Sequence, residues 1–287
     1  MKSLTDYSFI DIHYHACPDL YLRRLSALGA GHAYQSLNGA VFLKSHLGST
    51  SVQATLAQSV GLPVFPSLVL NPIAGGIDYR VIQHALADYQ SDVNVKMIVH
   101  FPTITGRSYQ SRLARQLAAP YLSEQTLKSD TVFNEQHQLK KEVIDILKMA
   151  GDYPIVLSTG HASKEETYEL VEKCAQYKVS HLLLNQPANP LTDLKADELK
   201  ALVDDNKFVW VEQTALTYLL GHQSQEDLAS VLTKVPRVIY SSDLGQTNQM
   251  DVASWINFSN ELFDLLSLSA QRREALLKEN AIQLLAS

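Results

Sequence analysis

Short apolar runs rich in β-branched residues alternate along the chain with longer segments whose apolar positions follow a helical period. Eight of these runs predict strands: Phe9–His15, Ala40–Lys44, Val64–Leu70, Lys96–Phe101, Ile155–Ser158, His181–Leu184, Phe208–Val211 and Val238–Tyr240. Seven segments predict helices: Ser51–Val60, Tyr79–Tyr89, Gln136–Met149, Lys164–Tyr177, Lys195–Asp205, Gln225–Thr233 and Val252–Leu266.

This alternation predicts βαβ units and a parallel sheet. We therefore expect an α/β fold in which residues 1–287 form a single (β/α)8 TIM-type barrel domain. An open doubly wound sheet is the structural alternative, but it usually has fewer strands, and no Gly-x-Gly-x-x-Gly turn follows the first strand. Near the end of the sequence, Ser269 is expected to cap an amphipathic helix. This helix would run to Leu285 and close the fold.

The segment 103–135 is much longer than an ordinary connection and follows the fourth predicted strand. In a barrel it would overhang the C-terminal mouth, so we expect an insertion that acts as a lid or contacts a neighbouring subunit. Its cationic and hydrogen-bonding side chains would then lie over a bound anion: Arg107, Tyr109, Arg112 and Arg115. A plain surface helix is the competing interpretation.

Composition narrows the class of protein. The chain has 46% hydrophobic and 19% charged residues and a formal net charge of −6, which indicates a large core. Lysines and arginines are scattered, so neither nucleic acid nor an anionic membrane is expected as a partner. There is no apolar run of membrane-spanning length, and Cys17 and Cys174 form no C-x-x-C motif. The first nine residues are too polar for a signal peptide, so we expect none. We predict a soluble cytoplasmic protein that binds a small molecule, with homo-oligomerisation left open.

Ionisable residues gather at the carboxyl ends of the predicted strands, where a (β/α)8 barrel places its chemistry. The residues concerned are His13, His15, Lys44, His46, His100, His161, Glu212 and Asp243. His13 and His15 alternate at the end of the first run, so both side chains should point to the same face of the strand.

Three imidazoles and one carboxylate of this group form a set of metal ligands: His13, His15, His161 and Asp243. Such a set can hold one divalent metal, best matched by zinc, and leave a position open for water. The metal would bring the pKa of that water towards neutrality and polarise a carbonyl. A carboxylate beside the water, here Asp243, can act as general base.

The motif order resembles the amidohydrolase superfamily of metal-dependent hydrolases. The likeness rests on Asp11-x-His13-x-His15, Gly160-His161, Ser242-Asp243 and the final Asn280–Leu285 segment. More narrowly, Pro18-Asp19, Leu43-Lys44-Ser45-His46, Pro102-Thr103 and Ser242–Gln246 are similar to an amidohydrolase-like branch without an established function. The resemblance covers essentially the whole chain and implies a barrel, a metal cofactor and hydrolysis.

Two departures bear on the number of metals. Asn185 stands where most superfamily members have a histidine after the sixth strand, and the fourth strand ends in His100 without the lysine or glutamate of two-metal members. The resemblance therefore implies a mononuclear site like that of deaminase-like, decarboxylase-like or lactonase-like members. Lys44 and His46 are additional polar groups on the second strand.

Our first hypothesis is a mononuclear metal-dependent hydrolase acting on a C–N or C–O carbonyl bond of a small polar metabolite. Asp243 and Lys44 would be catalytic, and His46, Asn185 and Glu212 would bind substrate. The alternatives are a metal-dependent decarboxylase or lactonase, in which Lys44 holds a carboxylate, and a barrel that binds a ligand without catalysis.

Several of these residues also have structural interpretations. Lys44 could instead form a buried ion pair with Glu212 or Asp243. Glu166 fits a helix capping box with Ser163 better than a catalytic role, and Asp19 fits a helix start as well as a substrate contact.

Overall fold

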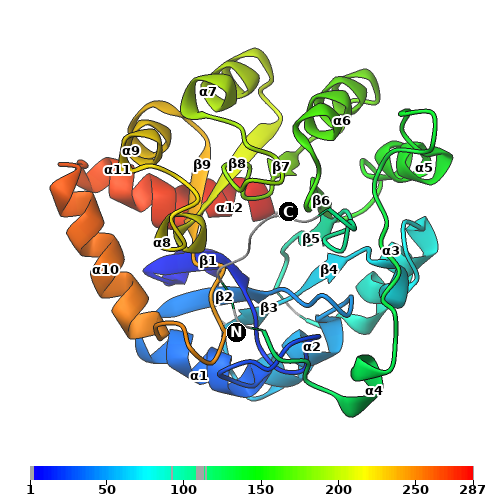
Figure 1. Ribbon diagram of the computed structural model, residues 1–287. Helices are drawn as coiled ribbons and strands as arrows, with labels where there is room; N and C mark the ends of the chain where they lie inside the picture. Colours follow the sequence, from blue (N-terminus) through cyan, green and yellow to red (C-terminus); the bar gives the residue numbers. More distant parts are fainter. Residues whose placement is uncertain (1–2, 92, 108–112, 114, 287) are drawn as a thin grey trace.

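In the part of the chain that the structure describes, the apolar runs form nine strands at the centre of the molecule, with helices around them (Figure 1). This computed structural model describes residues 3–91, 93–107, 113 and 115–286. The strands are β1 Phe9–Tyr14, β2 Gly39–Leu43, β3 Val64–Phe65, β4 Ser67–Val69, β5 Met97–His100, β6 Ile155–Ser158, β7 Leu182–Leu184, β8 Val209–Thr214 and β9 Val238–Ser241. Every predicted run overlaps a strand, so the predicted α/β class is confirmed.

All strand pairs in the described residues are parallel, and they form two sheets, one with the order β1-β2-β3 and one running from β4 to β9. The predicted third strand is divided between the two sheets at Pro66, which has no N–H to donate to a neighbouring strand. Two backbone hydrogen bonds join β1 and the residue after it to the segment that follows β9: Asp243 N–H donates to His13 O at 2.9 Å, and His15 N–H donates to Leu244 O at 2.9 Å.

The helices follow the strands around the outside. They are α1 Ala27–Ser36, α2 Ser51–Ser59, α3 Tyr79–Asp88, α4 Pro120–Ser123, α5 Lys141–Met149, α6 Lys164–Gln176, α7 Ala196–Asp205, α8 Ala215–Leu219, α9 Gln225–Lys234, α10 Val252–Leu265, α11 Ala270–Glu274 and α12 Asn280–Leu285, with short turns η1 Leu4–Asp6, η2 Pro72–Ala74 and η3 Ala275–Glu279. No helix of the described residues is both long and apolar enough to cross a membrane.

Helices α1, α4 and α8 were not among the predicted helices, and the predicted start of α5 at Gln136 precedes its observed start at Lys141. α1 contains Gly29 and Gly31 and no strong apolar stripe, so its sequence lacks the usual helical signature. Gly31 lies so close to β3 that an added Cβ would come within 2.9 Å of Val64. The predicted Ser163 cap is confirmed, because the Glu166 carboxylate accepts from Ser163 N–H and the Ser163 hydroxyl accepts from Glu166 N–H.

The two faces of the strands are buried in different surroundings. One face packs against the C-terminal helix α12, where Leu284 and Leu285 meet Ile10, Phe42 and Ile239. The other face packs against the surrounding helices in a larger apolar cluster. The predicted closing helix thus covers one face of the strands, although it is divided into α11, η3 and α12.

The described part of segment 103–135 crosses the loop that follows β1. Leu22 N–H donates to Gln116 O at 2.9 Å, and Ala118 N–H donates to Leu20 O at 3.0 Å. Arg107 forms an ion pair with Glu166 at 2.7 Å. Tyr109 and Arg112, which were predicted to face a bound anion, lie outside the described residues. The lid and subunit-contact interpretations therefore stay predictions.

Replacing Gly245 by alanine should destabilise the fold where the segment after β9 meets the end of β1. Gly245 has φ +120°, and an added Cβ would lie 1.9 Å from the backbone oxygen of His15. We expect a loss on the order of 3 kcal/mol in the free energy of unfolding, measured by urea denaturation. Gly151→Ala is the control, because its added Cβ meets nothing within 4 Å. Equal stability of the two variants would contradict the close contact.

Candidate metal site at the strand ends

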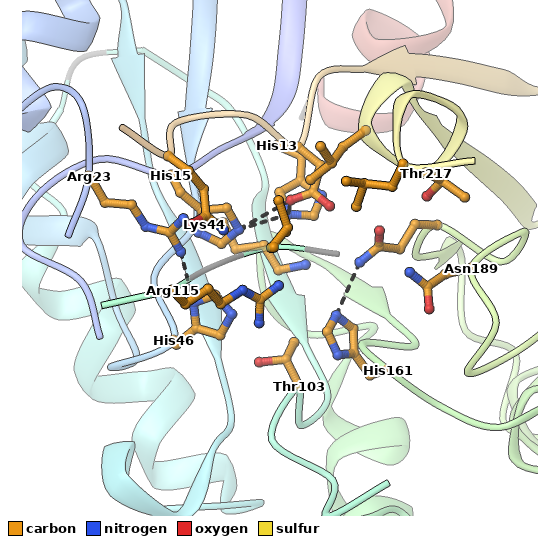
Figure 2. A pocket seen from close by; sticks show the side chains of 16 residues that line it. His13, His15, Arg23, Lys44, His46, Thr103, Arg115, His161, Asn189 and Thr217 are labelled. Carbon is orange, nitrogen blue, oxygen red and sulfur yellow. Dashed lines mark hydrogen bonds and ion pairs between the residues drawn. The ribbon is translucent and has the colours of Figure 1, made fainter. Parts of the chain in front are cut away.

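A cavity opens at the carboxyl ends of the strands, and several predicted residues line it. Figure 2 shows His13, His15 and Lys44 between a group containing Arg23, His46 and Arg115 on one side and His161, Asn189 and Thr217 on the other. The remaining lining residues are Thr103, Leu113, Gln186, Leu216, Leu220, Asp243 and Gln246. Loops after several different strands therefore build one site.

Three of the four predicted metal ligands converge in this cavity. His13 Nε2 lies 3.3 Å from His15 Nε2 and 3.1 Å from Asp243 Oδ1, and His15 Nε2 lies 3.3 Å from the same Asp243 oxygen. All three residues are buried, Asp243 being the most exposed of them at 13% of its side chain. The backbone hydrogen bonds between β1 and residues 243–244 bring these atoms together.

Glu212 stands behind His13. Its Oε1 atom accepts from the Ser241 hydroxyl at 2.7 Å and lies 2.9 Å from His13 Nδ1. Its Oε2 atom accepts from the Asn185 side chain and from Gln186 N–H. Glu212 was predicted to bind substrate, but it is 1% exposed and is not among the described residues that line the cavity. In this position it fixes the tautomer and orientation of His13.

Lys44 reaches the cavity from β2. Its ammonium group donates to Asn185 Oδ1 at 2.6 Å, and Asn185 in turn donates to Glu212. Asn185 therefore lies behind the cavity beside Lys44. Among the described residues Lys44 forms no ion pair with Asp243 or Glu212, so the predicted direct pair is absent there. Burial lowers the pKa of Lys44, although Glu212 and Asp243 act in the opposite direction.

His161, the fourth predicted ligand, lines the cavity without joining the three-residue cluster. Its Nε2 atom lies 3.1 Å from the side-chain nitrogen of Gln186. Burial and the charge of Lys44 hold the pKa of His161 well below its usual value, so the ring is neutral and able to bind a metal.

His100 is buried near the cluster, with its ring centroid 6.4 Å from that of His13. Its Nδ1 atom pairs with the Ser158 hydroxyl at 2.8 Å, and its Nε2 atom has no hydrogen-bond partner in the described part of the chain. Its burial indicates a histidine of the core.

A second cluster, which the sequence analysis did not predict, surrounds Asp19. Arg23 binds the Asp19 carboxylate through Nε at 2.7 Å and Nη2 at 2.6 Å. Asp19 also accepts from the Ser45 hydroxyl and from His46 N–H. Asp19 does not begin a helix, so that interpretation is wrong. The i,i+4 spacing of Asp19 and Arg23 was the available signal.

The electrostatics of the cluster suit a cation. Burial and Arg23 lower the pKa of His15 to about 4, which keeps the ring neutral. Burial would also lower the pKa of His13, but Asp243 and Glu212 raise it to about 9. Both ring nitrogens of His13 are therefore protonated at neutral pH. Burial alone would raise the pKa of Asp243, but the neighbouring His13 lowers it. The pKa of Asp243 therefore lies well below its usual value. A divalent metal can replace the proton on His13.

The geometry also fits a metal. With bonds of about 2.0–2.1 Å to a tetrahedral zinc ion, two ligand atoms lie about 3.3 Å apart. The three separations among His13, His15 and Asp243 are 3.3, 3.1 and 3.3 Å. A second group of possible ligands, His15, Asp19 and His46, fits less well because Arg23 already neutralises its only carboxylate.

Asp11 on β1 connects this strand to the segment after β9 that carries Asp243. Its carboxylate accepts from the Tyr34 hydroxyl, from Ser242 N–H at 3.0 Å and from His13 N–H at 3.1 Å. Asp11 is fully buried, and burial raises its pKa to about 6 even though these hydrogen bonds lower it. Asp11 therefore positions the backbone of His13 and Ser242 and does not line the cavity.

Comparison with known proteins identifies one family. Residues 8–212 match a family of unknown function, DUF6282. The match extends from β1 to β8, so it includes His13, His15 and His161 and ends before Asp243. No curated protein matches the chain.

Replacing Asp11 by asparagine should change how stability depends on pH. Because the folded-state pKa of Asp11 is raised from 3.8 to about 6, protonated Asp11 stabilises the fold at low pH, and this contribution is lost as the pH rises through about 6. The gap in unfolding free energy between the wild type and Asp11→Asn should therefore narrow by up to about 3 kcal/mol from about pH 4 to about pH 7. Urea denaturation across this range measures it, with the exposed Asp152→Asn as control. A gap that widens with pH would refute the assignment.

Proposed function

The chain belongs to the DUF6282 family of unknown function, and from the site we propose that it is a metal-dependent hydrolase of a C–N or C–O carbonyl bond in a small polar metabolite. The cofactor in this proposal is one divalent metal, best matched by zinc. A single observation carries it: two imidazole nitrogens and one carboxylate oxygen, all buried, lie within 3.3 Å of one another at the strand ends.

We also propose that the two sheets are parts of one (β/α)8 barrel. The hydrogen bonds from residues 243–244 to β1 support this, because they place the last strand beside the first. At the other junction, β3 and β4 are consecutive pieces of one extended segment that Pro66 interrupts. Counting that segment once gives the eight strands that such a barrel requires.

The metal would be held by His13, His15 and Asp243, with His161 as a further ligand from across the cavity. When bound, it would supply Lewis acidity to the substrate carbonyl and to a water molecule. Glu212 would hold the proton on His13 Nδ1, which directs Nε2 towards the metal. Asp243, partly open to the cavity, would accept a proton from the water and return it to the leaving group.

Lys44 would act as a cationic hydrogen-bond donor to substrate. Asn185 fixes its ammonium group from one side at 2.6 Å, so the remaining protons can be directed into the cavity. His46 would take part in binding on the opposite side, whereas Asn185 and Glu212 would position Lys44 and His13. The charge that remains on Lys44 suits either a developing oxyanion or a carboxylate.

Decarboxylation and lactone opening are the alternative reactions at this metal. Asn185 supports these alternatives. Its side chain is hydrogen-bonded to Lys44 and Glu212, so it does not provide a ligand for a second metal, and Lys44 beside it could hold a carboxylate. Lactones, cyclic amides and aromatic acids tested on one preparation separate the reactions, and release of carbon dioxide would favour decarboxylation. A non-catalytic barrel is the third possibility, and failure of all three substrate classes on metal-loaded protein would support it.

Replacing His13 by alanine should abolish metal binding. We expect about one zinc-like ion per chain in wild-type protein purified without added metal, and less than about a tenth of that in His13→Ala, measured by elemental analysis. His84→Ala is the control, because His84 lies on α3 with its side chain 80% exposed.

A variant that keeps all the ligands provides a second test. Glu212→Gln should weaken metal affinity by about 10- to 100-fold, because His13 loses the carboxylate that orients it. Circular dichroism of each variant shows whether the fold is intact. Wild-type protein that takes up no metal from a zinc-containing buffer would end the proposal.

A further inference from the structure

One wall of the cavity carries two arginine side chains next to the ring of Tyr21. The guanidinium carbons of Arg23 and Arg115 lie 5.8 and 5.1 Å from the centroid of the Tyr21 ring. His46 meets the same ring edge-on at 5.6 Å. Figure 2 shows Arg23, His46 and Arg115 together on the side of the cavity opposite His161 and Asn189.

The charges on this wall do not cancel. Asp19 is fully engaged by Arg23, which binds it through two nitrogens. Arg115 is exposed, lines the cavity and forms no ion pair within the described part of the chain. The wall therefore carries two guanidinium groups and one carboxylate, so one positive charge remains for a ligand.

We propose that this wall binds an anionic group of the substrate, a carboxylate or a phosphate. Arg115 provides the unneutralised charge, and Arg23, held by Asp19, provides a second fixed guanidinium beside it. A planar guanidinium pairs with such oxyanions through parallel N–H···O bonds. The inference rests on the proposed function in taking this cavity as the substrate site, and it places the anionic end of the substrate across the cavity from His161.

Anion binding to metal-free protein tests this inference without using the metal. Protein treated with a chelator is titrated calorimetrically with succinate, with inorganic phosphate and with succinamide, the uncharged analogue of succinate. We expect at least one anion to bind about tenfold more tightly than succinamide, and Arg115→Gln to weaken that binding about tenfold. The control is Arg80→Gln, on the exposed surface of α3.

The outcomes separate this inference from the proposed function. Stronger binding of succinate or of phosphate assigns the anion as a carboxylate or a phosphate. Equal binding of anions and succinamide, or an Arg115→Gln variant that binds like the wild type, overturns the anion subsite. Absence of metal uptake overturns the proposed hydrolase and leaves the result of this titration unchanged.

A second surface is distinguished by its lack of charge. Val52, Leu56 and Val60 follow α2 and its C-cap at intervals of four residues, and they are 52%, 60% and 66% exposed. Leu28 on α1 is 45% exposed. Residues four apart lie on one side of a helix, so α2 presents an apolar stripe to solvent.

The sequence around this stripe is almost free of charge. Residues 25–77 contain a single Asp, Glu, Lys or Arg, the buried Lys44, whereas about ten would be expected at the chain's 19% of charged residues. Figure 1 shows α1 and α2 next to each other on the outside of the molecule, between α10 and α3. Those two flanking helices carry charged residues, among them Arg80, Asp88, Glu261 and Asp264.

We propose that the α1–α2 face, defined by Leu28, Val52, Leu56 and Val60, binds the same face of a second copy of this chain. An apolar, charge-depleted centre with a charged border is the composition of a protein–protein interface core and rim. A partner with charges at its centre would bury them unpaired on this face, whereas a second α1–α2 face presents none. Interfaces between two identical patches are the commonest in homo-oligomers.

Sedimentation equilibrium tests the proposal on the full chain. We expect wild-type protein to be a dimer at micromolar concentration and Leu56→Lys to raise the dimer dissociation constant at least about 100-fold, because two lysines would be buried at the symmetric contact. Leu265→Lys is the matched control, since Leu265 is 67% exposed on α10, outside the face. A monomeric wild type, or a Leu56→Lys variant that still dimerises, overturns the proposal. Binding of monomeric wild type to anionic lipid vesicles would assign the stripe to a membrane surface instead and equally overturn it.

Discussion

The site depends on the hydrogen bonds that the buried carboxylate of Glu212 accepts. A charge in the interior is tolerated only when hydrogen bonds and opposite charges satisfy it. Glu212 meets that requirement by accepting from His13, Ser241, Asn185 and Gln186. Through Asn185 it also fixes Lys44. One side chain on β8 thus determines the orientation of groups that come from β1, β2, β7 and β9.

The order of the elements was largely predictable from the sequence because strands and helices have different periods. Each predicted strand is present, and the parallel arrangement follows from the alternation with helices. The errors have local causes. α1 has small residues and two glycines where an amphipathic helix would have an apolar stripe. The division at Pro66 depends on which neighbouring strand each half pairs with, and that is a tertiary property.

The candidate site was predictable only where its residues stand at strand ends. His13, His15, Lys44 and Asp243 meet because the carboxyl ends of parallel strands share one edge. Asn185 and Glu212 were found at the right ends, but the sequence could not show that they would face other protein groups instead of the cavity. Residues contributed by loops, such as Arg23 and Gln186, have no periodicity to reveal them, whereas Arg115 was predicted from the length and charge of segment 103–135. Their place depends on loop conformations that long-range packing determines.

The hydrogen bonds between β1 and residues 243–244 have a consequence for how the protein is made. His13 and Asp243 are separated by most of the chain, yet each supplies a backbone group to the other's segment. During synthesis the edge of β1 that faces β9 has no partner until the last strand has left the ribosome. The three metal-type ligands are therefore completed late, after nearly all the other strands can have paired. A nascent chain would hold two imidazoles without their carboxylate until residues 243–244 pair with β1.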